Sequence, residues 1–402
     1  MLEAHESPGL IAERRLVVSD GVSGAPEYVG PYRIDALIGA GGMGDVYRAE
    51  RADGAYRQTV ALKVLRLGYR TNEMVRRFRI EREALARLAH PGIATILDGG
   101  TLEDGRPYIV LEFVQGVPVT GYCAEHRLTL EDRLALFLRI VSAVQFAHGR
   151  LVIHRDLKPS NILVQADGMP RLLDFGIAKL LDVGADASLA TDTSTEGRLL
   201  TPEYAAPEQI RGEQPTTATD VYALGVLLFE LLTGSKPFPA AGRTLPALER
   251  AVLDTAPPTP SGIVDAPVGS RRLRGDLDRI VLMALRKEPD RRYTSAGQLG
   301  EDVERYLSGR PVMARPDSVG YRARKFVGRN RALVAAVASI ALLLVGFATT
   351  ATLQARRVSR ERDRAQRERV AADEVLSILT RLFERGDPNK HPGGDPLRVT
   401  SL

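Results

Sequence analysis

Two short polar motifs in the middle of the chain hold the residue types that phosphoryl transfer requires. Residues 154–161 read HRDLKPSN and residues 174–176 read DFG, with a hairpin pattern between them. Asp156 is suited to accept the hydrogen bond of an incoming hydroxyl group, and Lys158 to neutralise charge on the moving phosphoryl group. Asn161 and Asp174 would hold Mg²⁺, with Mn²⁺ as an alternative, against the phosphates of ATP. The two motifs therefore predict phosphoryl transfer from ATP.

A glycine-rich loop and a short apolar strand precede these motifs. Residues 39–46 read GAGGMGDV and residues 60–63 read VALK. Glycines at this spacing also begin dinucleotide-binding units, but there the loop runs into a helix. Here a β-type run lies on each side of the loop, at 32–38 and from Val46 to Ala49. In this order, the four motifs resemble those of the eukaryotic-like (Hanks-type) Ser/Thr protein kinases of bacteria, over roughly residues 32 to 308.

The resemblance implies an α+β fold, the bilobal protein kinase fold, and the uncharged residues 332–353 after it predict a single transmembrane α-helix. Residues 32–115 would form a β-rich N-lobe and residues 116–308 a helical C-lobe, with ATP between them. Residues 1–31 are mixed polar and small, without a long apolar run, and predict a flexible segment with no cleaved secretory signal. The single cysteine, Cys123, excludes an internal disulfide framework and suits a reducing compartment.

The resemblance also implies a nucleotide site. Lys63 would grip the α and β phosphates and pair with a glutamate on the next helix, where Glu81 and Glu83 are candidates. Glu81 is favoured because it shares the apolar face of that helix. Glu112 and Val114 would bond adenine through their backbones, although their run also suits an ordinary core strand. The expected catalytic residues are Lys63, Asp156 and Lys158, and the expected nucleotide-binding residues are Ile38, Gly39, Gly41, Gly44, Val46, Ala61, Lys63, Glu81, Glu112 and Val114.

Three residues of the C-lobe are expected to stabilise the fold. An aspartate at the position of Asp220 is commonly a helix cap, and the resemblance implies that it also anchors the backbone of the catalytic loop. Glu208, in the Ala-Pro-Glu motif, is expected to form an ion pair with Arg292. We interpret this pair as a stability feature and not as part of the chemistry.

Residues of the catalytic and activation segments bear on the acceptor and on regulation. Lys158 is typical of Ser/Thr kinases, and Thr201 occupies the position of a threonine that bonds the catalytic aspartate and lysine. Arg155 marks, in the family, kinases whose activation loop is ordered by its own phosphate. The candidate phosphorylation sites are Thr191, Thr193, Ser194 and Thr195. The alternative is that these hydroxyl groups only solubilise the loop.

Two other classes of function were weighed against a protein kinase. A pseudokinase acting as a membrane-tethered binding module is the first, but every catalytic position is intact. A small-molecule kinase of the same fold, such as an antibiotic phosphotransferase, is the second. Such enzymes lack the Ala-Pro-Glu activation segment that Thr201 to Glu208 supplies. A protein substrate with a serine or threonine acceptor is therefore expected.

Residues 332–353 carry no charge over 22 positions. A helix rises ~1.5 Å per residue, so this stretch would span ~33 Å against a hydrocarbon layer of ~30 Å. The alternative, a helix buried in a soluble domain, would need a second large domain to cover it. Residues 312–369 carry 13 Lys and Arg against 4 Asp and Glu, while the whole chain is only +5. The basic charge thus belongs to the flanks of the span and gives no support to nucleic-acid binding.

The orientation follows from the resemblance and not from charge, because arginines flank the span on both sides. An ATP-using kinase domain implies a cytoplasmic N-terminal side and a single pass through the inner (cell) membrane. Residues 309–331 would be a basic juxtamembrane segment, and 354–402 a short extracytoplasmic helical tail. Small residues at 335, 339, 346 and 350 have a spacing that favours pairing of the span with itself in a homodimer.

Overall fold

The computed structural model describes residues 27–41, 44–54, 56–65, 76, 80, 82–83, 85–175, 202–240, 244–316 and 318–385. The chain divides into two compact units, Met1–Lys325 and Phe326–Leu402. Most of the segment predicted to be flexible, residues 1–31, lies outside the described residues.

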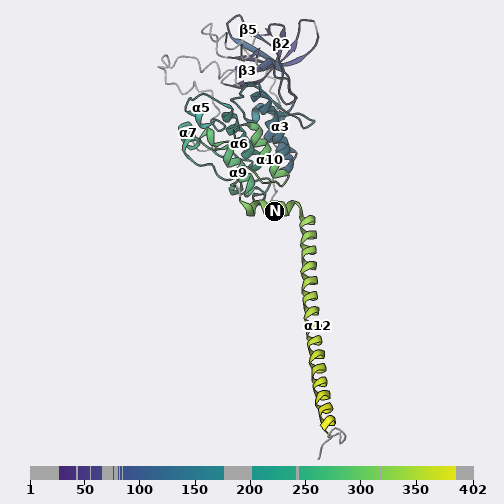
Figure 1. Ribbon diagram of the computed structural model, residues 1–402. Helices are drawn as coiled ribbons and strands as arrows, with labels where there is room; N and C mark the ends of the chain where they lie inside the picture. Colours follow the sequence, from purple (N-terminus) through teal and green to yellow (C-terminus); the bar gives the residue numbers. More distant parts are fainter. Residues whose placement is uncertain are drawn as a thin grey trace, which may run out of the picture. The chain divides into compact units, whose positions relative to one another are not determined.

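An antiparallel sheet forms the N-terminal lobe of the first unit (Figure 1). In spatial order its strands are β1 Tyr28–Val29, β2 Tyr32–Gly41, β3 Gly44–Arg51, β4 Thr59–Leu65, β6 Pro107–Glu112 and β5 Ile96–Thr101. Val60, Leu62 and Val64 of β4 pack into the core of this lobe. Because side chains alternate along a strand, Ala61 and Lys63 point to the opposite face. The period-2 pattern of VALK thus sets the direction of the lysine.

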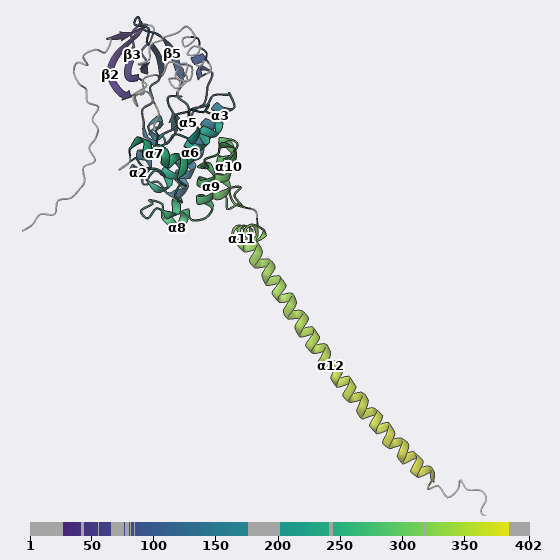
Figure 2. The same cartoon turned by 90° about the vertical axis from the view of Figure 1, so that its left-hand side faces the viewer.

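Helices make up the second lobe (Figure 2). The described α-helices of this lobe are α2 Val119–Glu125, α3 Leu130–His148, α5 Pro207–Ile210, α6 Thr217–Thr233, α7 Leu245–Asp254, α8 Ser270–Leu273, α9 Asp276–Ala284 and α10 Ala296–Leu307. Single turns lie at η1 Pro159–Asn161, η3 Pro260–Gly262 and η4 Pro289–Arg291. Cys123 is buried in α2.

Two long helices form the centre of this lobe, and local sequence explains where each begins and ends. The hydroxyl of Thr129 accepts the backbone N–H of Asp132 at 3.2 Å and caps the start of α3. Thr216 caps α6, which ends at Gly234 with a φ of +73°. Glycine tolerates this left-handed conformation and therefore terminates the helix. Almost all residues of α6 are buried, so this helix is the core around which the lobe packs.

A small three-stranded sheet carries the two chemical motifs. Its order is β7 Val117–Pro118, β8 Ile162–Val164 and β9 Pro170–Leu172. Strands β8 and β9 form the hairpin that the sequence indicates between the motifs, with Ile162 paired to Leu172. The HRDLKPSN segment therefore enters the hairpin and the DFG segment leaves it, at the same end.

The chain remains packed on the helical lobe after α10. Asp302 is fully buried, and its carboxylate accepts the backbone N–H of Ala314 at 2.9 Å and the hydroxyl of Tyr293 at 2.8 Å. In α11, Val319–Arg329, the ammonium of Lys325 lies 2.7 Å from the carboxylate of Asp276. The predicted juxtamembrane segment therefore begins as part of the folded lobe, held by buried carboxylates.

The second unit consists mainly of α12, an unbroken helix over Arg331–Arg385 (Figure 2). Among the described residues, this is the one helix whose length and composition would allow it to cross a membrane. The predicted span, 332–353, occupies only its first part. The charged stretch that follows continues the same helix without a break.

Glu208 and Arg292 form a buried bidentate ion pair, with both N···O distances at 2.7 Å. Each residue is 2 % exposed. The same guanidinium also donates to the carbonyl oxygens of Ala218 at 2.8 Å and Arg286 at 2.7 Å. Burial raises the pKa of Glu208, but hydrogen bonding and charge from Arg292 bring it below its ordinary value. Glu208 is therefore favoured in its ionised form, and the ion pair joins α5 to α6 and to η4.

We expect Arg292→Leu to lower the free energy of unfolding by about 3–5 kcal/mol, because it leaves the Glu208 carboxylate buried without its partner. The measurement is denaturant unfolding of the full chain in detergent. Arg271→Leu, at an exposed position of α8, is the control and should change it by no more than about 0.5 kcal/mol. Equal effects of both substitutions would contradict this reading of the pair.

Candidate active site

The catalytic-loop residues Asp156, Lys158 and Asn161 lie together. The ammonium of Lys158 is 2.8 Å from Oδ2 of Asp156, and Nδ2 of Asn161 donates to the same oxygen at 3.0 Å. Asn161 also donates to the backbone carbonyl of Asp156 at 2.8 Å. Asp156 is 8 % exposed. Two side chains of the same loop, Lys158 and Asn161, thus fix the direction of the Asp156 carboxylate.

Asp220, near the start of α6, binds the backbone of this loop through its carboxylate. Its Oδ2 accepts the N–H of His154 at 2.8 Å, and its Oδ1 accepts the N–H of Arg155 at 2.9 Å. Nε2 of His148, from α3, donates to Oδ2 at 2.7 Å. Asp220 has no exposed surface. Three donors therefore satisfy a buried carboxylate that would otherwise be costly.

His154 connects the loop to the strand that carries Asp174. Its Nε2 lies 3.0 Å from the carbonyl oxygen of Leu173, and its ring packs on Phe175 with centroids 4.6 Å apart. Burial lowers the pKa of His154, which favours the neutral ring. The N–H of Leu173 donates to the carbonyl of Asn161 at 2.8 Å. The two candidate metal ligands, Asn161 and Asp174, are thereby carried by segments bonded to each other.

Lys63 and Asp174 form an ion pair between the two lobes. Lys63 is 6 % exposed. Asp174 has a φ of +50°, a left-handed conformation that costs a non-glycine residue about 1–3 kcal/mol and needs support from its surroundings. The predicted helix partner of Lys63, Glu81, lies outside the described residues. The pairing of Lys63 with Glu81 therefore stays a prediction.

The glycine-rich loop joins β2 to β3 above this pair. Gly39 is paired with Val46, and Gly41 with Gly44. A Cβ at Gly44 would lie 2.2 Å from the carbonyl oxygen of Val64, so only glycine fits there. The predicted nucleotide-binding residues Ile38, Val46 and Ala61 are partly buried on β2, β3 and β4. They belong to neighbouring strands of one sheet, beside Lys63.

A cavity between the lobes extends from Lys63 and Asp174. Its apolar lining comes from Leu85, Leu88, Ile93, Ala94, Ile96, Ile109, Leu111 and Phe175. At the predicted hinge, the N–H of Glu112 donates to the carbonyl of Thr95 at 2.9 Å. Of the two backbone groups of Glu112, the carbonyl is therefore the one suited to adenine. Val114 is buried.

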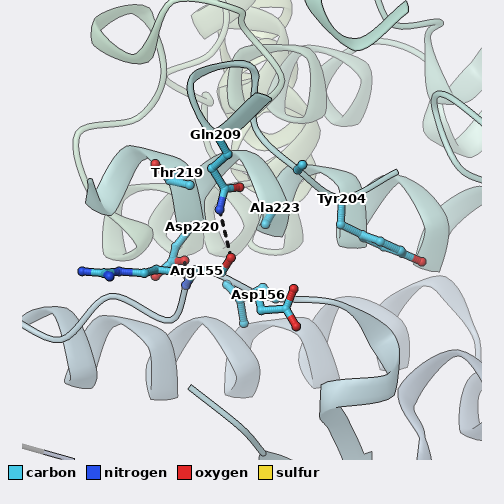
Figure 3. Close-up of a pocket in the computed structure, with 9 residues that line it drawn as sticks. Arg155, Asp156, Tyr204, Gln209, Thr219, Asp220 and Ala223 are labelled. Carbon is cyan, nitrogen blue, oxygen red and sulfur yellow. Dashed lines mark hydrogen bonds between the residues drawn. The ribbon is translucent and has the colours of Figure 1, made fainter. Parts of the chain in front are cut away.

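An ion pair and a cavity near the site were not foreseen in the sequence. The carboxylate of Glu112 forms an ion pair with Arg171 of β9, which also donates to the carbonyl of Pro91 at 2.6 Å. Asp156 also lines a second cavity, together with Tyr204, Gln209 and Ala223, among others (Figure 3). The position of Gln209, directly after the Ala-Pro-Glu motif, was the only signal available for it.

The candidate regulatory residues lie outside the described residues. These are Thr191, Thr193, Ser194, Thr195 and Thr201. The segment is described again from residue 202, and there Glu203 forms an ion pair with Lys236. The hydroxyl of Tyr204 donates to Glu230 at 2.6 Å. Burial raises the pKa of Glu230.

An antiparallel lobe carrying a buried lysine, over a helical lobe carrying an HRD-type loop, defines the fold of protein kinases. The family model described as a protein kinase domain matches residues 32–301, and the chain belongs to this family. The predicted bilobal fold, with a long apolar helix after it, is confirmed.

Bacterial serine/threonine kinases are among the curated relatives that the chain resembles. Serine/threonine-protein kinase PrkC of Bacillus subtilis is 39 % identical over 277 residues, which cover 68 % of this chain and 40 % of the relative. Serine/threonine-protein kinase PknB of Mycobacterium tuberculosis is 34 % identical over 288 residues, covering 70 % and 44 %. The chain therefore spans about two-fifths of the length of these two relatives.

Among solved structures, the kinase domain of PknI from Mycobacterium tuberculosis is similar to this chain, with a TM-score of 0.52 and 26 % identity. The match covers 69 % of this chain and 96 % of the other. The likeness of fold therefore concerns the kinase domain.

Proposed function

We propose that this chain is a serine/threonine protein kinase, transferring the γ-phosphoryl group of Mg-ATP to protein hydroxyl groups. The observation that carries the proposal is the arrangement of Lys63, Asp174, Asp156, Lys158 and Asn161. Lys63 and Asp174 pair between the lobes, and Lys158 and Asn161 both contact the carboxylate of Asp156. The backbone bond between Leu173 and Asn161 joins the two groups. Phosphoryl transfer depends mainly on such positioning and charge neutralisation.

Each of these residues has a role that follows from its contacts. Asp156, held by Lys158 and Asn161, would orient the acceptor hydroxyl and take its proton. Lys158 would then neutralise charge on the transferred group, and Lys63 charge on the nucleotide phosphates. Asn161 and Asp174 offer the amide and carboxylate oxygens that hard divalent cations prefer. A bound Mg²⁺ would shield the phosphate charge, and Mn²⁺ suits the same ligands.

The nature of the acceptor is supported by Lys158 and by the relatives. Lys158 stands two positions after Asp156, as the resemblance to Ser/Thr kinases implies. The curated relatives carry the name of serine/threonine kinases. Every proposed catalytic position keeps its functional residue, which argues against a pseudokinase.

We expect Lys63→Ala and Asp156→Asn to lower autophosphorylation at least about 100-fold, since both remove groups that act on charge in the transition state. The assay is transfer of labelled phosphate from ATP by the purified full chain with Mg²⁺. Asp290→Asn, at an exposed position of η4, is the control for loss of a carboxylate and should keep wild-type activity. Near wild-type rates in either site variant would disprove the assigned site.

We further propose that α12 anchors the kinase domain in the cell membrane through residues 332–353. The support is an uncharged stretch within a helix that is long and apolar enough to span a bilayer. Its apolar side chains are exposed, among them Leu342, Leu344 and Phe347 at 77, 63 and 73 %. Such exposure is unfavourable in water but suits lipid. Because ATP is cytoplasmic, the kinase domain would lie on that side of the inner membrane.

Deleting residues 332–353 should move the protein from the membrane fraction to the soluble fraction and leave phosphate transfer intact. The fractions are compared by ultracentrifugation and immunoblotting of cells that express either form. Extraction of the full chain with salt alone would contradict a membrane span, because salt weakens only charge interactions.

Autophosphorylation of the activation loop is the regulatory part of the proposal. The loop contains Thr191, Thr193, Ser194 and Thr195, and Arg155 precedes the catalytic aspartate. A phosphate adds about −1.5 to −2 charge and oxygens that pair with arginine. Pairing of two spans in a homodimer would bring one kinase domain to the loop of another.

Active protein should therefore carry phosphate between Thr191 and Thr195, detected by mass spectrometry. In a mixture, a wild-type chain should also phosphorylate this cluster in an Asp156→Asn chain of different mass. A chain with all four hydroxyl residues replaced by alanine should be less active. Full activity of that variant would refute activation by the loop.

A further inference from the structure

The peptide before the catalytic aspartate has a strained conformation that its neighbours must maintain. Arg155 has a φ of +66°, a left-handed backbone value that residues other than glycine rarely adopt. Strain of this kind persists only where the surroundings fix it. Because Arg155 directly precedes Asp156, its backbone conformation sets where the Asp156 carboxylate points.

Two side chains hold the two ends of this residue's backbone. Asp220 accepts the N–H of Arg155 at 2.9 Å, and Gln209 donates from Nε2 to the carbonyl oxygen of Arg155 at 3.0 Å (Figure 3). The contact from Asp220 is the one that the family resemblance implies. The contact from Gln209 comes from α5, at the end of the activation segment.

The amide of Gln209 uses both of its ends. Oε1 accepts the backbone N–H of Ala206 at 3.0 Å, so Nε2 is the group that faces Arg155. The neighbouring Glu208 is locked by Arg292 and by the hydroxyl of Thr219, at 2.9 Å. The Gln209 amide thus links the backbone of Ala206 to the backbone of Arg155, and the ion pair of Glu208 holds the adjacent residue of α5 in place. An ionised glutamate in place of Gln209 would have the same shape but no hydrogen-bond donor, and a methionine would lack both the amide donor and the amide acceptor.

We propose that Gln209 is a positioning residue for phosphoryl transfer, which couples the end of the activation segment to the peptide that presents Asp156. The inference rests on the proposed kinase function. A displacement of Ala206 would move the amide, and the amide would move the Arg155 carbonyl. Gln209 touches neither ATP nor acceptor in this role, and acts only through the direction of Asp156.

The first test is steady-state kinetics of the full chain in detergent, comparing Gln209→Glu and Gln209→Met with wild type. Misplacement of a catalytic group by about 1 Å costs on the order of 100-fold in rate, so we expect kcat to fall about 10- to 100-fold in both. KM for ATP should stay within about twofold, because ATP is not touched. Gln214→Glu, an exposed glutamine nearby, adds the same charge and should keep wild-type kcat.

The pH dependence of kcat distinguishes a hydrogen-bonding role of Gln209 from a role in packing alone. In Gln209→Glu the ionised carboxylate would face the Arg155 carbonyl without a donor, whereas its protonated form would restore an O–H donor. The kcat of Gln209→Glu relative to Gln209→Met should therefore rise as pH falls from about 8 to about 6. The ionisable residues of this cavity, Arg155, Asp156, Tyr204 and Asp220, are common to both variants, so the ratio removes their titration.

Hydrogen exchange tests the bridge without any assay of activity. Gln209→Met should speed exchange of the amides of residues 154–157 and leave those of α3 unchanged. Unchanged exchange in the loop, or a ratio of kcat values independent of pH, would overturn the proposal. So would a rise in KM for ATP at constant kcat. An inactive wild-type chain with the expected exchange pattern would instead count against the proposed kinase function alone.

Discussion

The structure of the site depends on one buried carboxylate, that of Asp220. An unpaired carboxylate in a protein interior is expensive, and the cost is removed only by donors placed around it. Here the donors are the ring of His148 and two consecutive backbone amides of the catalytic loop. The helix α6 that carries Asp220 is itself almost wholly buried. The backbone of the loop is therefore bonded to a helix that is almost wholly buried in the lobe.

From Asp220 the constraint passes outward through backbone groups to the reacting side chains. The amide of Arg155 is held, its φ is left-handed, and Asp156 follows with its carboxylate bonded to Asn161 and Lys158. Asn161 is then joined to Leu173 across the hairpin, next to Asp174. The segments are thus joined by hydrogen bonds and ion contacts of 2.8 to 3.0 Å. A site of this kind is preorganised, which is what charge stabilisation in a transition state requires.

The sequence predicted the fold, because the fold rests on local patterns, and it named the residues of the candidate site. VALK alternates as a strand, and the hairpin between the motifs has its turn residues, so the face of β4 that carries Lys63 and the end of the hairpin that Asp174 follows were foreseeable. Contacts between distant segments were less accessible. Glu112 and Arg171 meet only because the hinge and β9 pack side by side, and no spacing along the chain encodes that pair. The same holds for Gln209, whose partner lies 54 positions away.

The connection between the kinase domain and α12 shows the same use of buried carboxylates. Asp302 and Asp276 accept from the backbone of Ala314 and from the ammonium of Lys325. These contacts order the chain well past the last helix expected for the domain. The chain is therefore packed on the helical lobe as far as Lys325. The sequence showed only basic charge here, because Asp276, the carboxylate that pairs with Lys325, lies on α9, far away along the chain.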